Sequence, residues 1–262
     1  MSATTPKKIK NLHISTVAED ARETALRYGL GLEIAEFCTA MNMDDAFAQW
    51  DTKVRTEIDG VARIMFHAPF NELCPAAIDP LVLDVARRRY RQAFQLAPQY
   101  GARRIVVHSG YVPLVYFKSY FHERSVEFWR ERLAELPRDI TLLLENVMED
   151  SPELLAGIVR EINDPRFRLC FDIGHANTII SNTPMDEWID TCAPHIGHVH
   201  IHNNYREWDD HNPPGDGIID MRHVLTRLTS EIPDDATYSI ESIASAPAAE
   251  WLAIEGFIDS PR

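Results

Sequence analysis

The sequence predicts an α/β protein in which eight parallel strands close into a single (β/α)8 TIM barrel. Short apolar runs rich in β-branched residues alternate with helical patterns along the chain, and a length of 262 residues is normal for such a barrel. No linker, low-complexity stretch or short repeat interrupts the sequence, so we expect one domain over residues 1–262. An open doubly wound sheet is the alternative. That fold more often carries a glycine-rich phosphate-binding turn after its first strand, and the sequence has none there.

Eight segments have the length and apolar character expected of barrel strands. In chain order they are IKNLHIST (9–16), GLEIAEF (31–37), RIMFHAP (63–69), RRIVVHS (103–109), ITLLLEN (140–146), FRLCFDIG (167–174), IGHVHIHN (196–203) and TYSIESI (237–243).

Helical patterns lie between these strands and after the last one. They are AEDARETALRYG (18–29), LVLDVARRRYRQAFQLAPQYG (81–101), SVEFWRERLAEL (125–136), SPELLAGIVREI (151–162), MRHVLTRLTSEI (221–232) and AEWLAIEGFI (249–258). Ser151 and Thr183 each precede a proline, so we expect them to cap helices. The segment 249–258 can dock on the barrel or on a second copy of the chain, and docking on the barrel is the default; the oligomeric state stays open.

Composition indicates a soluble globular protein, with 45% hydrophobic and 25% charged residues. Four cysteines without a CxxC pair favour a reduced protein without disulfides. The first ten residues, MSATTPKKIK, lack the apolar core of a signal peptide, and no run is long enough to span a bilayer. We therefore expect a cytoplasmic protein with no membrane partner.

The formal net charge of −14 opposes general attraction to nucleic acid, whose phosphates dominate its affinity for proteins. The strongest basic runs, Arg87–Arg91 and Arg103–Arg104, fall inside a predicted helix and at the start of a predicted strand. Both places lie away from the C-terminal ends of the strands, so these runs are expected to be solvated surface charge. A nucleic acid partner is therefore not expected.

Polar residues that can bind metals occur at or near the ends of the last six predicted strands. Barrel active sites form at the C-terminal ends of the strands, so these side chains should meet in one place. They are His67, His108, Glu145, Asp172, His200 and Glu241, with His175 three residues after Asp172.

Three carboxylates and one imidazole, from Glu145, Asp172, His200 and Glu241, suit Mn²⁺, Mg²⁺, Co²⁺ or Zn²⁺. Such an ion can grip two oxygens of a sugar and stabilise an enediolate. Glu145 and Glu241 come from strands on different sides of the barrel. Two carboxylates so placed can remove a proton from one face of a carbon and return it from another, as catalytic acid and base.

The segments LLLEN, FDIGHA, HVHIHN and HNPPGDGIID resemble the xylose isomerase-like TIM barrel superfamily. This superfamily holds sugar isomerases and epimerases, related dehydratases, and endonuclease IV-type apurinic endonucleases (the AP endonuclease family 2). The resemblance implies a metal site of Glu145, Asp172, His200 and Glu241. It also implies a substrate contact from His175. His108 and Arg206 are further candidates for substrate binding, and a surface salt bridge is the alternative for Arg206. In HVHIHN the three histidines share one side of a strand. His200 is the implied ligand, and His198 and His202 flank it.

The endonuclease IV-type pattern, with up to three zinc ions, can also be laid on this chain. It adds His67, His108, His175, Asp209 and His211 to the ligand set. However, the loop CTAMNMDDAFAQW (38–50) is acidic where such an enzyme is expected to place a DNA-penetrating arginine. Both this loop and the net charge argue against a DNA substrate.

Three functions therefore follow from the sequence. The first is a divalent-metal-dependent isomerase or epimerase of a small sugar, sugar phosphate or polyol, working through an enediolate, with a dehydratase as a close variant. The second is a trinuclear zinc phosphoesterase of the apurinic endonuclease type. The third is a catalytically silent barrel that binds a ligand or partner. The silent barrel should have lost an acid–base residue, and both Glu145 and Glu241 are present.

Overall fold

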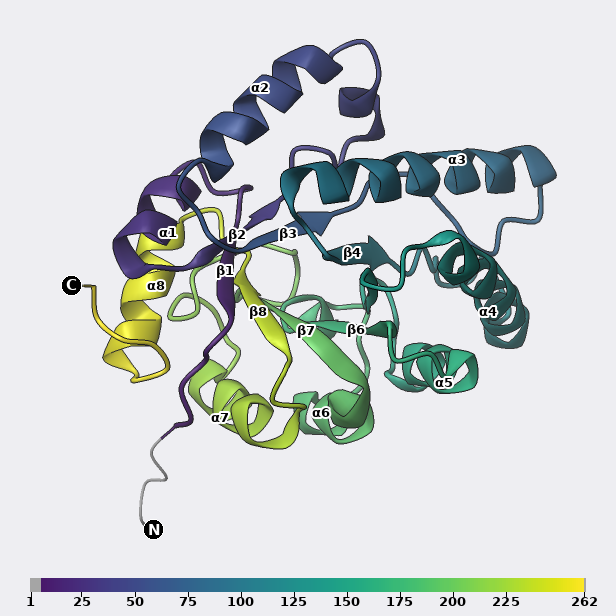
Figure 1. Cartoon of the computed structure of the whole chain (residues 1–262). Coiled ribbons are helices and arrows are strands. Elements are labelled where there is room, and N and C mark those ends of the chain that lie inside the picture. The colour runs from purple at the N-terminus through teal and green to yellow at the C-terminus, as the bar shows by residue number, and fades with distance from the viewer. Residues whose placement is uncertain (1–5, 262) are drawn as a thin grey trace.

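The computed structural model describes residues 6–261 and contains the closed eight-stranded parallel barrel that the sequence predicts (Figure 1). Each strand pairs with the next along the chain, and β1 pairs with β8 to close the ring. The strands are β1 (Leu12–Ser15), β2 (Gly31–Ile34), β3 (Ile64–His67), β4 (Arg104–His108), β5 (Thr141–Glu145), β6 (Phe167–Asp172), β7 (Ile196–Ile201) and β8 (Thr237–Ile240).

Within the described residues, eight α-helices surround the strands as an outer layer. They are α1 (Ala21–Tyr28), α2 (Phe47–Ile58), α3 (Pro80–Leu96), α4 (Lys118–Glu135), α5 (Glu153–Ile162), α6 (Met185–Cys192), α7 (Met221–Glu231) and α8 (Ser245–Ile254). Short 3₁₀ turns are η1 (Ala40–Met43), η2 (Ala97–Tyr100), η3 (His175–Asn177) and η4 (Ala193–His195). None of the helices within residues 6–261 has the length and apolar character that crossing a bilayer requires.

Local details differ from the expectations in several places. Helix α4 begins at Lys118, seven residues before the expected start, and the helix expected over 81–101 ends as α3 at Leu96 and continues as η2. The acidic segment 38–50, expected as a loop, contains η1 and the first turn of α2. The caps expected at Ser151 and Thr183 are wrong: α5 and α6 begin after Pro152 and Pro184, and no side chain caps either helix. Thr183 instead donates its hydroxyl hydrogen to the carbonyl of Asp150 at 3.0 Å.

The barrel interior changes from apolar to polar along the strands, and this change creates the site. Side chains two residues apart on a strand face the same way. Strands β3 to β6 therefore point an apolar residue inward, followed by a polar one nearer the C-terminal end. Met65, Val106, Leu143 and Cys170 form one buried apolar cluster. The residues two positions later are His67, His108, Glu145 and Asp172.

The first and last βα units are joined by Asp20, which precedes α1. One carboxylate oxygen of Asp20 accepts hydrogen bonds from the backbone N–H and the hydroxyl of Ser245, at 2.9 and 2.8 Å. Its other oxygen accepts from the backbone N–H of Ala246 at 2.9 Å. The carboxylate thus satisfies donors at the N-terminus of α8, which lies beside α1 (Figure 1). The C-terminal helix therefore docks on its own barrel.

Candidate metal centre

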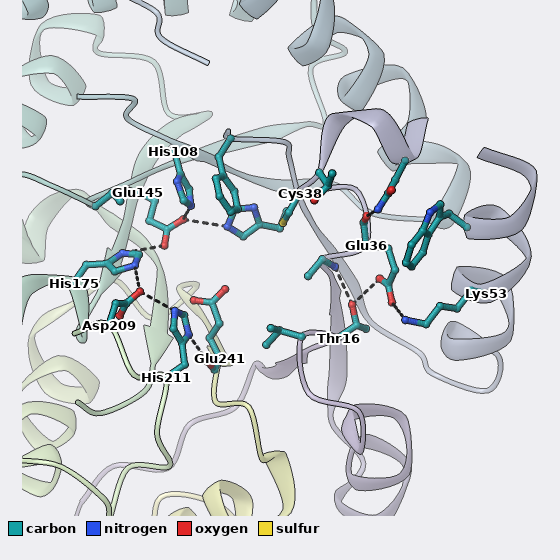
Figure 2. A pocket seen from close by; sticks show the side chains of 18 residues that line it. Thr16, Glu36, Cys38, Lys53, His108, Glu145, His175, Asp209, His211 and Glu241 are labelled. Carbon is teal, nitrogen blue, oxygen red and sulfur yellow. Dashed lines mark hydrogen bonds and ion pairs between the residues drawn. The ribbon is translucent and has the colours of Figure 1, made fainter. Parts of the chain in front are cut away.

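A cavity of about 510 Å³ opens at the C-terminal end of the barrel (Figure 2). One side of its wall carries acidic and imidazole groups from the later strands and loops, including Glu145, Asp209 and Glu241. The opposite side carries Glu36, which follows β2, and Trp50 and Lys53, which belong to α2. The cavity therefore lies between two walls. One wall carries polar residues that can bind a metal, and the other is built by the second βα unit.

The four residues predicted as a metal site come together. Glu145, Asp172, His200 and Glu241 each offer a ligand atom, and these atoms all lie within 4.8 Å of one another. Asp172 and His200 are register partners on β6 and β7, which places their side chains next to each other. Nδ1 of His200 lies 3.0 Å from Glu145 Oε1 and 2.9 Å from Glu241 Oε2. All four residues are buried, and Glu241 also lines the cavity.

A second group shares Glu145 with the first. His67 and His108 each place Nε2 3.2 Å from Oε2 of Glu145. His108 and Glu145 are register partners on β4 and β5. Since the other oxygen of Glu145 faces His200, this carboxylate bridges two potential metal-binding groups.

A third group consists of His175, His202, Asp209 and His211. Oδ2 of Asp209 lies 3.1 Å from Nε2 of His175 and 2.9 Å from Nε2 of His211. The ring of His202 stacks on that of His211 with centroids 4.1 Å apart. His202 was not predicted as a ligand. Its place on the same strand face as His200 was a usable signal, but the position of the Asp209 loop was not readable.

The electrostatics of these groups favour a bound cation. Burial opposes ionisation of Glu145, but His108 and His200 outweigh it and hold the pKa of Glu145 well below its usual value. Burial likewise opposes ionisation of Asp172, and His175 and His202 hold its pKa well below the usual value. Burial disfavours a charged His211, yet the nearby acidic groups, chiefly Asp209, raise its pKa to about 9. The centre thus gathers ionised carboxylates that need positive charge.

The donors fit a divalent cation. Oxygen and imidazole ligands at this spacing suit Mn²⁺, Mg²⁺, Co²⁺ or Zn²⁺, and metal binding replaces protons on such ligands. In the third group Nδ1 of His202 is buried and has no hydrogen-bond partner among residues 6–261, which is unusual for a buried polar atom unless a ligand is bound there. Cys170 lies near His198 and His200, and burial raises the pKa of this thiol well above its usual value.

The remaining predicted site residues divide between the cavity and its surroundings. His108 and His175, which were predicted to contact substrate, line the cavity. Arg206 is not one of the cavity-lining residues; its guanidinium donates to the carbonyl of Ser181 at 3.3 Å. His198 is fully buried beneath the centre, where it contacts Glu33, a residue that the sequence interpretation missed.

A closed (β/α)8 barrel whose C-terminal mouth gathers carboxylate and imidazole groups that could hold a metal ion defines a class of barrel enzymes. Within this class the chain belongs to the xylose isomerase-like TIM barrel family, whose sequence profile matches residues 25–255.

Three similar proteins illustrate this relationship. An uncharacterized Methanocaldococcus jannaschii protein, MJ1311, is 33% identical over 189 residues, which is 68% of this chain and 64% of MJ1311. The structure of the TTHB071 protein from Thermus thermophilus, soaked with zinc chloride, matches with a TM-score of 0.73 and 26% identity over 94% of this chain and 98% of that one. A D-tagatose 3-epimerase-like protein matches with a TM-score of 0.74 and 26% identity over 94% of this chain and 95% of that one.

Proposed function

We propose that this protein is a divalent-metal-dependent isomerase or epimerase of a small carbohydrate. The observation that carries the proposal is the convergence of Glu145, Asp172, His200 and Glu241 at the cavity, with ligand atoms within 4.8 Å of one another. Similarity to a D-tagatose 3-epimerase-like protein supports the same reaction class. The four residues would hold the metal.

When bound, the cation supplies positive charge that orients adjacent sugar oxygens and stabilises developing negative charge. Glu241 and Glu145 do the proton transfer. One carboxylate takes the proton from the carbon beside the carbonyl, and the electron pair of that C–H bond becomes the double bond of an enediolate. The other carboxylate returns a proton to a carbon of the enediolate. His108 and His175, which line the cavity, contact sugar hydroxyls.

The substrate that the cavity fits best is a free sugar rather than a sugar phosphate. Lys53 is the one lysine or arginine among the residues of 6–261 that line the cavity, and Glu36 pairs with it at 3.2 Å. Barrel enzymes often bind phosphate at loops after the seventh and eighth strands and at a helix N-terminus. Here Asp20 already occupies the N-terminus of α8. Trp50, which also lines the cavity, has the Lys53 ammonium over its ring at 5.3 Å from the centroid.

Solvent exchange tests this function without knowledge of the product. The metal-loaded protein is incubated with ketoses and aldoses in D₂O, and NMR follows deuterium entering the carbon beside the carbonyl. The expected result is exchange that requires a divalent metal and is faster for a ketose than for its phosphate ester. Protein that binds metal but exchanges no carbon-bound proton in any sugar tested would contradict the proposal.

A trinuclear zinc phosphoesterase is the second candidate, because two further ligand groups adjoin the first. His67 and His108 share Glu145 with it, and His175, Asp209 and His211 form the third group with His202. A metal cluster of this kind can generate hydroxide and bind a phosphate. Three zinc ions per chain together with nicking of an abasic DNA duplex would favour this candidate. About one ion per chain with no nicking would favour the sugar enzyme.

A further inference from the structure

Glu33 is a fully buried carboxylate directly below the candidate metal centre. It lies on β2, and its Oε1 is 3.1 Å from Nε2 of His200. Its Oε2 is 3.1 Å from Nε2 of His198 and also accepts a hydrogen bond from the hydroxyl of Ser239. Three donors from β7 and β8 thus converge on one side chain from β2.

We propose that Glu33 is a positioning residue that fixes the tautomer of His200 and aims its other nitrogen at the metal. This inference rests on the proposed metal centre. A neutral imidazole carries one N–H, and an ionised carboxylate can only accept. When a cation replaces the proton on Nδ1, the one remaining hydrogen of His200 is therefore on Nε2, which donates it to Glu33. The lone pair of Nδ1 is then free to bind the cation.

The surroundings of Nδ1 place this nitrogen at the candidate centre. Nδ1 of His200 faces three carboxylates, with Glu241 at 2.9 Å, Glu145 at 3.0 Å and Asp172 at 3.4 Å. These are the other members of the candidate centre, so the lone pair points to the place where a cation would bind. A carboxylate behind a metal-binding histidine holds the ring orientation and raises the basicity of the ligand nitrogen.

Glu33 is itself held in place by a chain of buried contacts. His198, which donates from Nε2 to Glu33, accepts at Nδ1 from the hydroxyl of Thr237 at 2.7 Å. The order Thr237, His198, Glu33, His200 links β8, β7 and β2 through residues that are all buried. His198 therefore has a structural role in this arrangement. Its hydrogen bond prevents rotation of the Glu33 carboxylate, which in turn positions His200.

Glu33→Gln tests the inference, with Ser239→Ala as the matched control. Glutamine keeps the shape but offers one acceptor oxygen and one donor nitrogen to two histidines that both need an acceptor. Ser239→Ala removes a donor to the same carboxylate and leaves the contact to His200. Titration of metal-free protein with Mn²⁺ and Zn²⁺ measures affinity, and thermal unfolding without metal measures the structural cost. We expect Glu33→Gln to weaken metal binding about 10- to 100-fold. The control should bind metal like the wild type.

The outcomes separate this inference from the proposed function. Wild-type protein that binds no divalent ion overturns the proposed function. If wild-type and Glu33→Gln proteins bind metal equally and the variant loses only stability, the positioning role is wrong and the proposed function is unaffected. If Glu33→Gln does not fold, long-range ¹H–¹⁵N NMR of the histidines in zinc-loaded wild-type protein decides. A proton on Nε2 of His200 with zinc on Nδ1 supports the inference, and a proton on Nδ1 with zinc on Nε2 refutes it.

Discussion

Replacing Asp20 with alanine removes the contact that joins the first βα unit to the last. Asp20 accepts three hydrogen bonds at the N-terminus of α8, each between 2.8 and 2.9 Å. Losing an N-terminal cap costs about 1 kcal/mol, and losing a negative charge beside a helix N-terminus costs up to about 1 kcal/mol more. We therefore expect a loss of about 2 kcal/mol. With an unfolding entropy of about 2.1 cal/mol/K per residue over 262 residues, Tm should fall by roughly 4 °C.

The pH dependence of this loss provides the sharper test. Burial opposes ionisation of Asp20, but the hydrogen bonds from Ser245 and Ala246 outweigh it and lower the pKa of Asp20 below its usual value. A lowered folded-state pKa means that the stabilisation is complete above the unfolded pKa, about 4, and is lost as pH falls through the folded pKa. The difference in Tm between wild type and Asp20→Ala should therefore be constant from neutral pH to about pH 5 and shrink at lower pH.

Calorimetric unfolding of metal-free protein across this pH range is the assay, with Asp20→Asn as the control that keeps the size of the side chain and removes its charge. A difference in Tm that is absent at neutral pH, or that does not change down to pH 3, would refute the role given to this carboxylate.

The remaining predictions concern the candidate centre. Glu145→Gln and Glu241→Gln should each slow deuterium exchange in the sugar by about 10²- to 10⁴-fold, measured by NMR. Glu149→Gln, which changes a buried carboxylate outside the cavity, should leave exchange unchanged. Asp209→Asn should lower the zinc content of zinc-loaded protein, measured by elemental analysis, while sugar exchange persists. Removing metal with EDTA from protein saturated at about 100 times Kd should cost about 2.7 kcal/mol and lower Tm by roughly 5 °C. Lys53→Met should raise KM for the sugar more than it lowers kcat, measured by steady-state kinetics.

Opposite results would each remove one part of the proposal. Undiminished exchange in both glutamine variants would exclude these carboxylates as acid and base. Loss of deuterium exchange in Asp209→Asn would mean that the third ligand group takes part in the sugar reaction. A Tm that EDTA leaves unchanged would mean that metal binding is not coupled to folding. A change in kcat alone for Lys53→Met would place this residue at the reacting carbons instead of the far end of the cavity.

The sequence predicted the barrel and much of the candidate site because both depend on local patterns. Alternation of short apolar strands with helices fixes the fold class, and a strand such as β5 points Leu143 and Glu145 the same way whatever its neighbours are. The C-terminal ends of parallel strands then have to meet at one end of the barrel.

The parts that the sequence did not reveal depend on contacts between distant elements. Glu33 looks like an ordinary polar strand residue until closure of the barrel brings side chains of β7 and β8 into contact with it inside the barrel. His202 joins the third group only because the loop after β7 returns Asp209 and His211 to it. For the same reason Arg206 was a reasonable candidate in the sequence, yet the path of that loop turns its guanidinium to Ser181.

The most direct test of the proposed metal centre is the divalent metal content of protein purified without added ions, compared between wild type and Glu145→Gln. Elemental analysis should find at least about one Mn²⁺, Mg²⁺, Co²⁺ or Zn²⁺ ion per wild-type chain and a large decrease in the variant, because Glu145 faces both His67 and His200. Wild-type protein that holds no divalent ion, even after addition of each metal, would contradict the proposal.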